Sequence, residues 1–288
     1  MTAIRARHTI RRRSTQLTHA APLRMSAPNR KVSESSPAPL KRDLVAGVEK
    51  GLTVIAAFDR DRPHMTISEV AAHCELTRAA ARRYLITLRH LGFVTNDGKQ
   101  FSLTPKVLRL AQSYMHSARL PHSVQPELHR LAYMLKESSS AGVLDGDDVL
   151  CVAALSVGRV VSSTLQPGTR VPAYCTANGR MLLSALPVPD MQAWVARQNL
   201  MPLTPNTITD AKKLIDEIAR VRAQGYAAVD QELELGLRTL AVPLLNSRGD
   251  ALAALNVSVH AARMSMTQLI EDCLPSLRHA QAQLKLVL

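Results

Sequence analysis

The 288-residue chain is poor in the residues that mark several functional classes. Aromatic side chains make up 3% of it, and its four cysteines, Cys74, Cys151, Cys175 and Cys273, show no paired spacing. This pattern favours reduced thiols over a disulfide framework or a zinc site. The ten histidines form no His-Glu-x-x-His pair, and the chain has neither a Walker loop nor a G-x-G-x-x-G turn. We therefore expect no metal ion and no cofactor.

Long hydrophobic runs are also absent. No apolar stretch approaches the roughly 18 residues that a membrane-spanning helix needs. Arg11-Arg12-Arg13 raises the alternative of a twin-arginine export signal, but no apolar segment follows these residues. The sequence thus predicts a cytoplasmic protein without a membrane partner.

Acidic residues are scarce in residues 1–42, which hold ten Lys and Arg against Glu34 alone. This leader carries +9 of the formal net charge of +13. It is rich in Ser, Pro and Ala, so we expect it to be disordered and to add salt-sensitive, non-specific affinity for nucleic acid. Met25 is an alternative start of translation.

The segment from Thr66 to Leu91 has the pattern of two short helices joined by a tight turn. Thr66 and Glu69 form a Thr-x-x-Glu capping box, which predicts a helix starting at Ile67. This helix runs out near residues 73–75, and Thr77 can cap a second helix. Two capped helices in this arrangement are typical of a helix-turn-helix, so duplex DNA is the first partner to consider.

The second helix is predicted to be amphipathic. At about 100° per residue, one side collects the apolar residues Ala81, Tyr84, Leu85, Leu88 and Leu91. The opposite side is basic, and arginines at the start of a recognition helix can bond guanine edges or phosphates. The predicted DNA-binding residues, which include the tip of the following hairpin, are Thr77, Arg78, Ala79, Arg82, Arg83, Arg89 and Lys99. For an isolated helix, a solvated charged face would be the simpler interpretation.

A β-hairpin is predicted directly after this helix. Gly92 ends the helix, and Asn96-Asp97-Gly98-Lys99 lies between two short β-prone segments. A hairpin in this place is a wing, whose Lys99 can reach a phosphate. Upstream, apolar residues at helical spacing predict the first helix of a three-helix core: Val45, Val48, Leu52, Ile55, Ala56 and Phe58. Residues 43–103 are therefore interpreted as a winged helix-turn-helix domain.

The second half of the chain mixes helical and strand periods. A linker helix is expected over residues 104–120, opening with Thr104-Pro105. In residues 121–288, helices are predicted from Val124 and over 189–200, 210–223 and 266–286, and strands over 141–144, 149–153, 160–165, 226–232, 239–245 and 251–259. This mixture indicates an α+β sensor domain. The Asp-rich segment 145–148 lacks the later ligands of a calcium loop, so a plain turn is favoured.

Residues 177–186 have a helical pattern, with Thr176 as the expected cap. A helix start presents free amides that can hold a carboxylate or another anion. Taken alone, this segment is interpreted more simply as a capped helix without a ligand.

Together these motifs resemble the IclR family of bacterial transcriptional regulators, over nearly all of residues 43–288. The matching stretches are VEKGLTVIAAF, TISEVAAHCELTRAAARRYLITLRHLGFV, FSLTPKVLRL, PAYCTANGRMLLSAL and GYAAVDQELELGLRTLAVPL. Within the family, TRAAARR, SLTPKVLRL, VLDGDDV and GTRVPAYCTANGR look most like the PcaR/PobR-type branch, which regulates the breakdown of protocatechuate and 4-hydroxybenzoate. The resemblance implies a winged helix-turn-helix, a linking helix and a GAF-like effector domain that binds a small organic acid. It also implies dimers or tetramers on operator DNA.

The resemblance further implies which residues form the walls of an effector pocket. In this chain the matching residues are Cys175, Thr176, Ala177, Asn178, Val229, Asp230, Glu232, Leu237, Thr239, Asn256 and Ser258. In some acid-binding relatives the position of Val229 is acidic and that of Thr239 is Cys, so their ligand does not transfer to this chain. An aromatic or other small carboxylic acid is the expected effector.

Two other functions are compatible with these residues. An enzyme with a DNA-binding appendage would use Cys175 as its nucleophile and Asp230 or Glu232 as an acid or base. No His lies near these residues in sequence to activate the thiol. A repressor of the same family that responds to a different small organic acid fits every motif. We expect a transcriptional regulator and not an enzyme.

Overall fold

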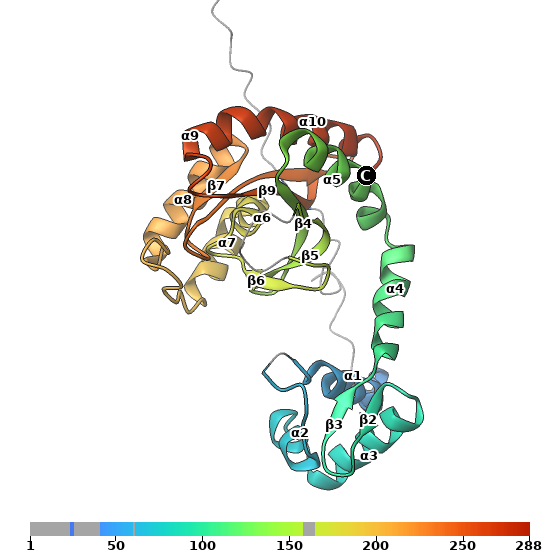
Figure 1. Cartoon of the computed structure of the whole chain (residues 1–288). Coiled ribbons are helices and arrows are strands. Elements are labelled where there is room, and N and C mark those ends of the chain that lie inside the picture. Colours follow the sequence, from blue (N-terminus) through green and yellow to red (C-terminus); the bar gives the residue numbers. More distant parts are fainter. Residues whose placement is uncertain (1–23, 26–40, 60, 158–164) are drawn as a thin grey trace, which may run out of the picture.

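The computed structural model describes residues 24–25, 41–59, 61–157 and 165–288. Helix α4 (Leu108–Ser117) joins a small amino-terminal part to a larger carboxy-terminal part (Figure 1). The predicted disorder of the leader concerns residues that lie mostly outside the described ones. It is wrong for Arg24–Met25, which form strand β1 and pair in parallel with Asp250 and Ala251. The strand expected over residues 160–165 also lies outside the described residues, apart from Leu165.

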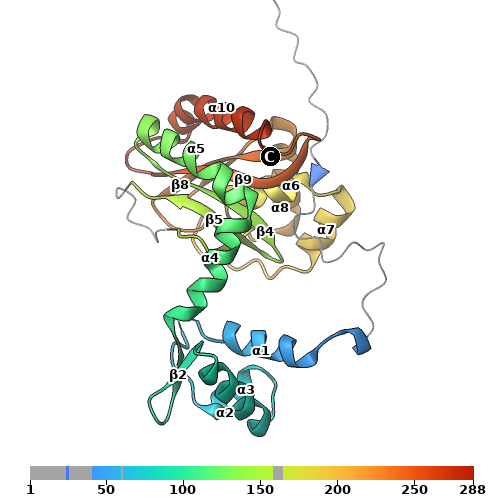
Figure 2. The same cartoon turned by 90° about the vertical axis from the view of Figure 1, so that its right-hand side faces the viewer.

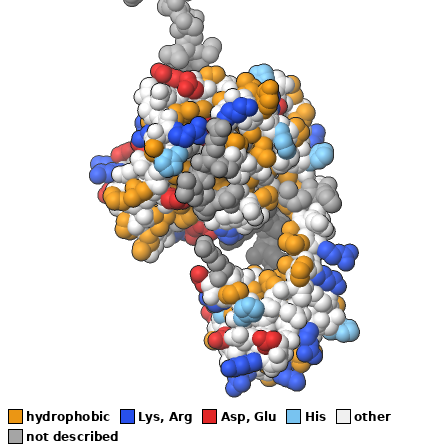
Figure 3. All heavy atoms as spheres, viewed as in Figure 1, with side chains coloured by type: hydrophobic (Ala, Val, Ile, Leu, Met, Phe, Trp, Pro, Cys, Tyr) orange, Lys and Arg blue, Asp and Glu red, His pale blue; other side chains and the backbone are white. Residues whose placement is uncertain are grey.

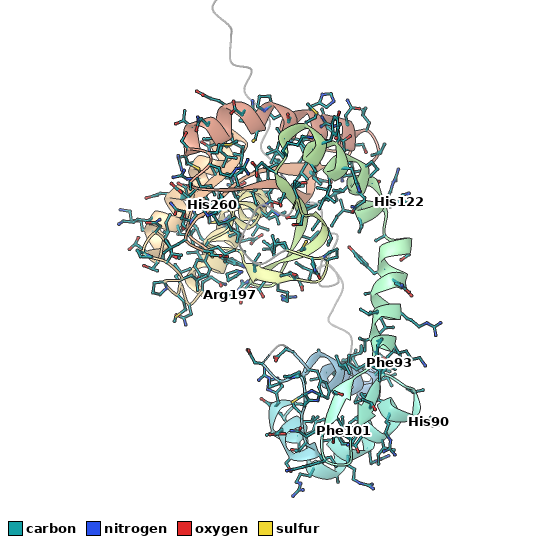
Figure 4. The ribbon with its side chains drawn as sticks, viewed as in Figure 1. His90, Phe93, Phe101, His122, Arg197 and His260 are labelled. Carbon is teal, nitrogen blue, oxygen red and sulfur yellow. The ribbon has the colours of Figure 1, made fainter. Side chains whose placement is uncertain are left out.

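The small part is the predicted winged helix-turn-helix. Its elements are α1 (Ala46–Ala56), α2 (Ile67–His73), α3 (Arg78–His90), β2 (Val94–Asn96) and β3 (Phe101–Leu103). The capping box of α2 is confirmed: Thr66 Oγ1 accepts from Glu69 N at 3.3 Å, and Glu69 Oε2 accepts from Thr66 N at 2.6 Å. Strands β2 and β3 pair antiparallel around the predicted turn, and Phe101 (Figure 4) is buried in the core beneath them.

The buried face of α1 differs from the prediction. Val45, Val48 and Leu52 were expected to face the core, but their exposed fractions are 69%, 60% and 57%. Val54 of α1 is buried instead, followed by Ala57 and Phe58 at its end. Leu91, expected on the apolar side of α3, is also exposed, because it lies at the carboxyl cap of that helix. Helix α1 carries apolar residues on more than one side, so periodicity alone did not decide which side packs.

The linker is helical but not continuous. A 3-10 turn (Pro105–Val107) leads into α4, and α5 (Arg119–Leu135) follows directly. Ala118 between them is extended (φ −80°, ψ 123°), so the predicted single helix over 104–120 is broken at that point. Helix α5 begins five residues before the predicted Val124. Its first turn tolerates Pro121, because the amides of a first helical turn have no partner within the helix and proline has no amide hydrogen.

The large part is built on one mixed sheet. Six antiparallel strands lie in the order β6 (Arg170–Pro172), β5 (Asp148–Leu155), β4 (Ser138–Asp145), β9 (Asp250–His260), β8 (Leu237–Leu245) and β7 (Ala227–Asp230), and β1 adds to β9. Register places Val229 opposite Thr239, and Thr239 opposite Ser258. Because directly paired residues lie on the same face of a sheet, these three side chains form a row across three strands.

Helices cover both faces of this sheet (Figure 2). Helix α5 and the carboxy-terminal helix pack on one face, around Leu128, Leu255 and Leu277. The other face is covered by α6 (Ala177–Ala185), α7 (Val188–Ala196) and α8 (Ala211–Gln224), around Leu182, Trp194 and Ile218. The carboxy-terminal helix was predicted to be continuous, but it consists of α9 (Met266–Gln268), the π-helical turn η3 (Leu269–Cys273) and α10 (Leu274–Lys285). Within the described parts of the chain, no helix is long and apolar enough to span a membrane.

Candidate DNA-binding surface and ligand cavity

The basic face of α3 is free to meet a partner. Thr77 caps the helix by accepting from Ala80 N at 3.2 Å, as predicted. Arg78, Arg82, Arg83 and Arg89 are all exposed, and none of them forms an ion pair within the described residues. Figure 3 shows Lys and Arg atoms gathered at the end of the small part that lies farthest from the sheet domain. Charged side chains without intramolecular ion pairs can meet phosphates without first breaking such a pair.

The wing presents Lys99 on a structured turn. Asp97 Oδ1 accepts from Lys99 N at 2.9 Å and from Gln100 N at 2.7 Å, and these backbone bonds lower the pKa of Asp97. Gly98 has a φ of +106°, which favours glycine at this position. The turn is thus ordered by its own hydrogen bonds, and the side chain of Lys99 is exposed at its tip.

The start of the linker is bonded to the end of the recognition helix. Thr104 Oγ1 donates to Gly92 O at 2.6 Å, and Lys106 Nζ donates to Leu91 O at 2.6 Å. Lys106 Nζ also lies 5.4 Å from the ring centre of Phe93 (Figure 4). These contacts of Thr104 and Lys106 were not predicted from the sequence, because a Thr-Pro-Lys segment is typical of a helix start.

A small cavity, partly open to solvent, lies between the sheet and the amino end of α6. Its walls contain nine of the eleven predicted effector residues: Cys175, Thr176, Ala177, Asn178, Val229, Leu237, Thr239, Asn256 and Ser258. Leu165, Val171 and Leu233 complete the lining. These three were not predicted, because an isolated apolar residue carries no chemical signal in a sequence.

The amino end of α6 offers hydrogen-bond donors to this cavity. Thr176 Oγ1 accepts from Gly179 N at 3.2 Å and donates to Pro172 O at 3.0 Å, which confirms the predicted cap. In an α-helix the first amides have no partner within the helix. Ala177 and Asn178 are the first two residues of α6 and line the cavity, and the start of a helix also carries a partial positive charge. This is the kind of site that holds a carboxylate.

The opposite wall contains polar side chains, because strand alternation places Thr239, Asn256 and Ser258 on the face towards α6 beside the apolar Val229 and Leu237. Asn256 Oδ1 accepts from Ser140 Oγ at 2.6 Å, and Asn256 Nδ2 donates to Ser258 Oγ at 3.3 Å.

Asn178 of α6 is 94% buried, since its exposed fraction is 6%, and within the described residues its Oδ1 has no hydrogen-bond partner. An unpaired buried polar atom costs free energy, and a bound polar molecule would recover part of that cost. No Lys, Arg, Asp or Glu lines the cavity among the described residues.

Two predicted effector residues do not line the cavity. Asp230 follows Val229 in β7 and so points to the other face, where Arg238 Nε donates to Asp230 Oδ1 at 2.7 Å. Glu232 lies beyond the strand, after Gln231 with its φ of +59°, and pairs with the buried Arg180. Both carboxylates are thus neutralised by arginines outside the cavity. Neither of them lines the cavity, and their role as effector contacts stays a prediction.

The Cys175 thiol is unsuited to nucleophilic attack. Burial, with a smaller contribution from the nearby negative charge of Glu232, raises its pKa to about 12. At neutral pH it is therefore a protonated, weakly polar part of the wall. His260 and Arg197, which are labelled in Figure 4, do not line the cavity. The cavity residues among the described ones offer no activated nucleophile.

A winged helix-turn-helix with an exposed basic face, joined to a domain with a small cavity at a helix start, is the architecture of a ligand-responsive DNA-binding protein. The IclR helix-turn-helix domain model matches residues 47–98, and the carboxy-terminal domain model of bacterial IclR transcriptional regulators matches residues 112–286. The chain belongs to the IclR family. Members of this family are transcriptional regulators. The family membership therefore excludes the hypothesis of an enzyme with a DNA-binding appendage.

Individual relatives agree with this assignment. The Pca regulon regulatory protein of Pseudomonas putida is 42% identical over 84% of this chain and 84% of its own. The crystal structure of a transcriptional regulator from Rhodococcus sp. RHA1 is 42% identical, with a TM-score of 0.75 over 85% of this chain and 98% of that one. A double mutant of the PobR inducer-binding domain from Acinetobacter, in complex with 3-hydroxybenzoic acid, is 34% identical over 57% of this chain and 97% of that one, with a TM-score of 0.55.

Proposed function

We propose that this protein regulates an operon for the breakdown of an aromatic acid and that it senses such an acid in the cavity beside α6. The observation that carries the proposal is the cavity itself, which combines apolar walls with the free amides of Ala177 and Asn178. The similarity to a Pca regulon regulator supports the pathway class. We infer a leader (1–42), a DNA-binding domain (43–103), a linker (104–120) and an effector domain (121–288). The protein acts in the cytoplasm.

Operator DNA is bound through the major groove by α3. Arg78, Arg82 and Arg83 reach base edges or phosphates, and Lys99 on the wing contacts the backbone. Thr77, Ala79 and Arg89 border this surface. The support is their shared exposure on one face and the absence of competing ion pairs among the described residues.

The effector is a carboxylic acid with an aromatic or similarly apolar body. Its carboxylate lies at the amides of Ala177 and Asn178, and its body contacts apolar residues such as Val171, Leu233 and Leu237. A hydroxyl group would meet the polar residues of β9 on the far wall. The 3-hydroxybenzoic acid in the related Acinetobacter domain belongs to this chemical class.

The protein acts as a dimer or a tetramer. Apolar residues that the chain itself leaves uncovered support this proposal: Leu44, Val45, Val48 and Leu52 at and beside α1, and Leu108, Leu110 and Tyr114 on α4. Figure 3 shows hydrophobic atoms over the linker. Exposed apolar surface of this kind marks an interaction site, and a symmetric pair would place two recognition helices on one operator.

Regulation requires that the acid binds one arrangement of the paired DNA-binding domains better than the other. The bonds from Thr104 and Lys106 to the end of α3 give a route by which the linker can turn the recognition helix. The sign of regulation depends on operator position, so activation and repression are both consistent with this arrangement.

A thermal-shift screen tests the effector class. The full chain is heated with protocatechuate, 4-hydroxybenzoate, β-ketoadipate or the unrelated acid pyruvate. Ligand at about 100 times its Kd should add roughly 2.7 kcal/mol to the free energy of unfolding. A clear shift with an aromatic acid supports the proposal. A shift with pyruvate alone would favour a regulator that responds to a different small organic acid, and no shift with any acid would contradict the proposed effector class.

A further inference from the structure

One ion pair in the large domain is almost entirely buried. Arg180 Nη1 donates to Glu232 Oε1 at 2.6 Å, and Arg180 Nη2 donates to Glu232 Oε2 at 2.5 Å. The exposed side-chain fractions are 1% and 7%. Arg180 Nε also donates to Tyr174 O at 3.0 Å, and Ile208 N donates to Glu232 Oε2 at 3.0 Å. Both charges are thus paired with each other and further hydrogen-bonded to the backbone inside the protein.

The pair joins two walls of the cavity. Arg180 is in the first turn of α6, two residues after Asn178, the last of the cavity residues 175–178. Glu232 belongs to the segment 231–236 between β7 and β8, which brings Leu233 and then Leu237 to the opposite side of the cavity. Two positive φ angles, +59° at Gln231 and +85° at Gly236, turn this segment out of one strand and into the next.

Further bonds connect the same segment to the loop before α8. Thr204 Oγ1 donates to Gln231 O at 2.7 Å, and Thr207 Oγ1 donates to Glu232 O at 2.7 Å. These bonds hold the segment from outside. The bidentate pair with Arg180 is the charged contact that fixes its distance from α6 and therefore the spacing of the two cavity walls.

Stability alone does not explain why charges are kept there. Taking two ions out of water has a desolvation cost that can exceed their attraction, and replacing a buried pair by apolar residues of similar volume is often neutral or stabilising. A bidentate Arg–carboxylate pair does provide a defined geometry. A small cavity depends on such a defined geometry, because a ligand contact that is displaced by about 1 Å loses much of its favourable interaction energy.

We propose that the Arg180–Glu232 pair is a positioning clamp that holds the Leu233–Leu237 wall against the amino end of α6 and thereby sets the affinity of the cavity for its acid. The proposal rests on the proposed function of the cavity as an effector site. It assigns to Glu232 a role different from the direct effector contact expected from the sequence.

The experiment compares variants in which the clamp, the charge and the stability change separately. Glu232→Gln leaves Arg180 as an unpaired positive charge near the carboxylate site, whereas Arg180→Met leaves Glu232 as an unpaired negative charge. A double variant, Arg180→Met with Glu232→Leu, removes both charges and retains an apolar filling. Glu217→Gln is the matched control, because it breaks the Arg220–Glu217 pair on the outer side of α8.

Acid affinity is measured by calorimetry with 4-hydroxybenzoate, or with protocatechuate if the wild type binds that acid more tightly. Melting temperature and operator affinity without acid are measured on the same samples. If the pair is a clamp, both single variants and the double variant bind the acid at least about tenfold more weakly. The double variant should melt no lower than the single variants. Operator affinity without acid and the control should stay near the wild-type values.

Three results would overturn the proposal. Tighter acid binding by Glu232→Gln with weaker binding by Arg180→Met would show that only charge matters. Wild-type acid affinity in the double variant would show that the pair has no positioning role. If that variant does not fold, Arg180→Lys replaces it, and unchanged acid affinity there would lead to the same conclusion. A wild-type protein that binds no acid of the panel would contradict the proposed function itself, and the clamp with it.

Discussion

The two binding surfaces of this protein are built in opposite ways. The DNA-binding surface uses charged, exposed side chains that lie within about one helix and one turn of each other, from Thr77 to Lys99. The cavity uses buried and half-buried, uncharged residues from Leu165 to Ser258, brought together by a sheet and a helix end. A long polyanion can be recognised by flexible cations at a surface, whereas a small acid needs fixed donors in a closed space.

This contrast predicts different sensitivities to mutation. At the DNA-binding surface, side chains should be replaceable one by one with moderate loss. In the cavity, a change in backbone position should weaken binding strongly even when no contact atom is removed.

The largest effect is expected for Gly179→Ala. A Cβ at this position would lie 2.1 Å from Ala173 O and 2.4 Å from Ala173 Cα, so the backbone must shift. Overpacking of this kind costs about 1–3 kcal/mol of stability or more, and displacement of the α6 amides should weaken acid binding about 100-fold. Calorimetry with the acid measures the loss. Gly47→Ala, which has open space on α1, is the control and should not affect acid binding.

Gly179→Ala also tests whether the cavity and the DNA-binding surface are independent of each other. Its affinity for non-specific duplex DNA should be close to that of the wild type. Acid binding as tight as in the wild type would show that the amino end of α6 does not form the site.

Arg82→Ala should have the next largest effect. If Arg82 reads a base, operator affinity falls by about 1–3 kcal/mol and the preference at one base-pair position is relaxed. Binding to a set of operator variants by fluorescence anisotropy measures both quantities. Equal weakening across all operator variants would instead identify Arg82 as a phosphate contact.

A smaller effect is expected for Thr176→Val, which keeps the shape of the side chain but removes its hydroxyl. Both hydrogen bonds of Thr176 Oγ1 are lost, and the loss of a helix cap costs about 0.5–2 kcal/mol. Denaturant titration should show this decrease together with weaker acid binding. Thr176→Ser should restore both, and a valine variant as stable as the wild type would argue against the cap.

The smallest effect at neutral pH concerns Cys175. Because burial raises its thiol pKa to about 12, the thiol keeps its proton and acid affinity should not change between about pH 6 and 8 on its account. A folded pKa above the unfolded one means that stability falls as pH rises from about 9 towards 12. Chemical denaturation over this range measures the fall, which should be smaller in Cys175→Ala. An acid affinity that titrates near the ordinary thiol pKa of about 8.5 would contradict this account.

The DNA-binding domain could be predicted almost completely from the sequence, because its signals are local. The Thr66 and Thr77 caps, the Gly98 turn and the basic face of α3 each depend on residues only a few positions apart. The face of α1 could not be predicted in the same way. Its residues Val45, Val48 and Leu52 satisfy the helical period but remain exposed, since packing against α3 requires only one of its apolar sides.

The cavity was predicted by resemblance more than by pattern. The cap at Thr176 is a local signal, but nothing local shows that Val229, Thr239 and Ser258 lie in one row, because register is a property of the folded sheet. Asp230 does not line the cavity, because alternation along β7 points it to the face opposite to that of Val229. The pairing of Glu232 with Arg180 joins residues 52 positions apart and leaves no signal in a single sequence.

The most direct test of the account is a titration of the full-length protein against operator DNA, selected from random sequence, at fixed salt concentration. The titration is made with and without saturating 4-hydroxybenzoate or protocatechuate, in the wild type and in Gly179→Ala. We predict that the acid changes the operator Kd of the wild type by about fivefold or more and leaves that of Gly179→Ala unchanged. An operator Kd that stays the same in the wild type, although calorimetry shows the acid bound, would contradict the account.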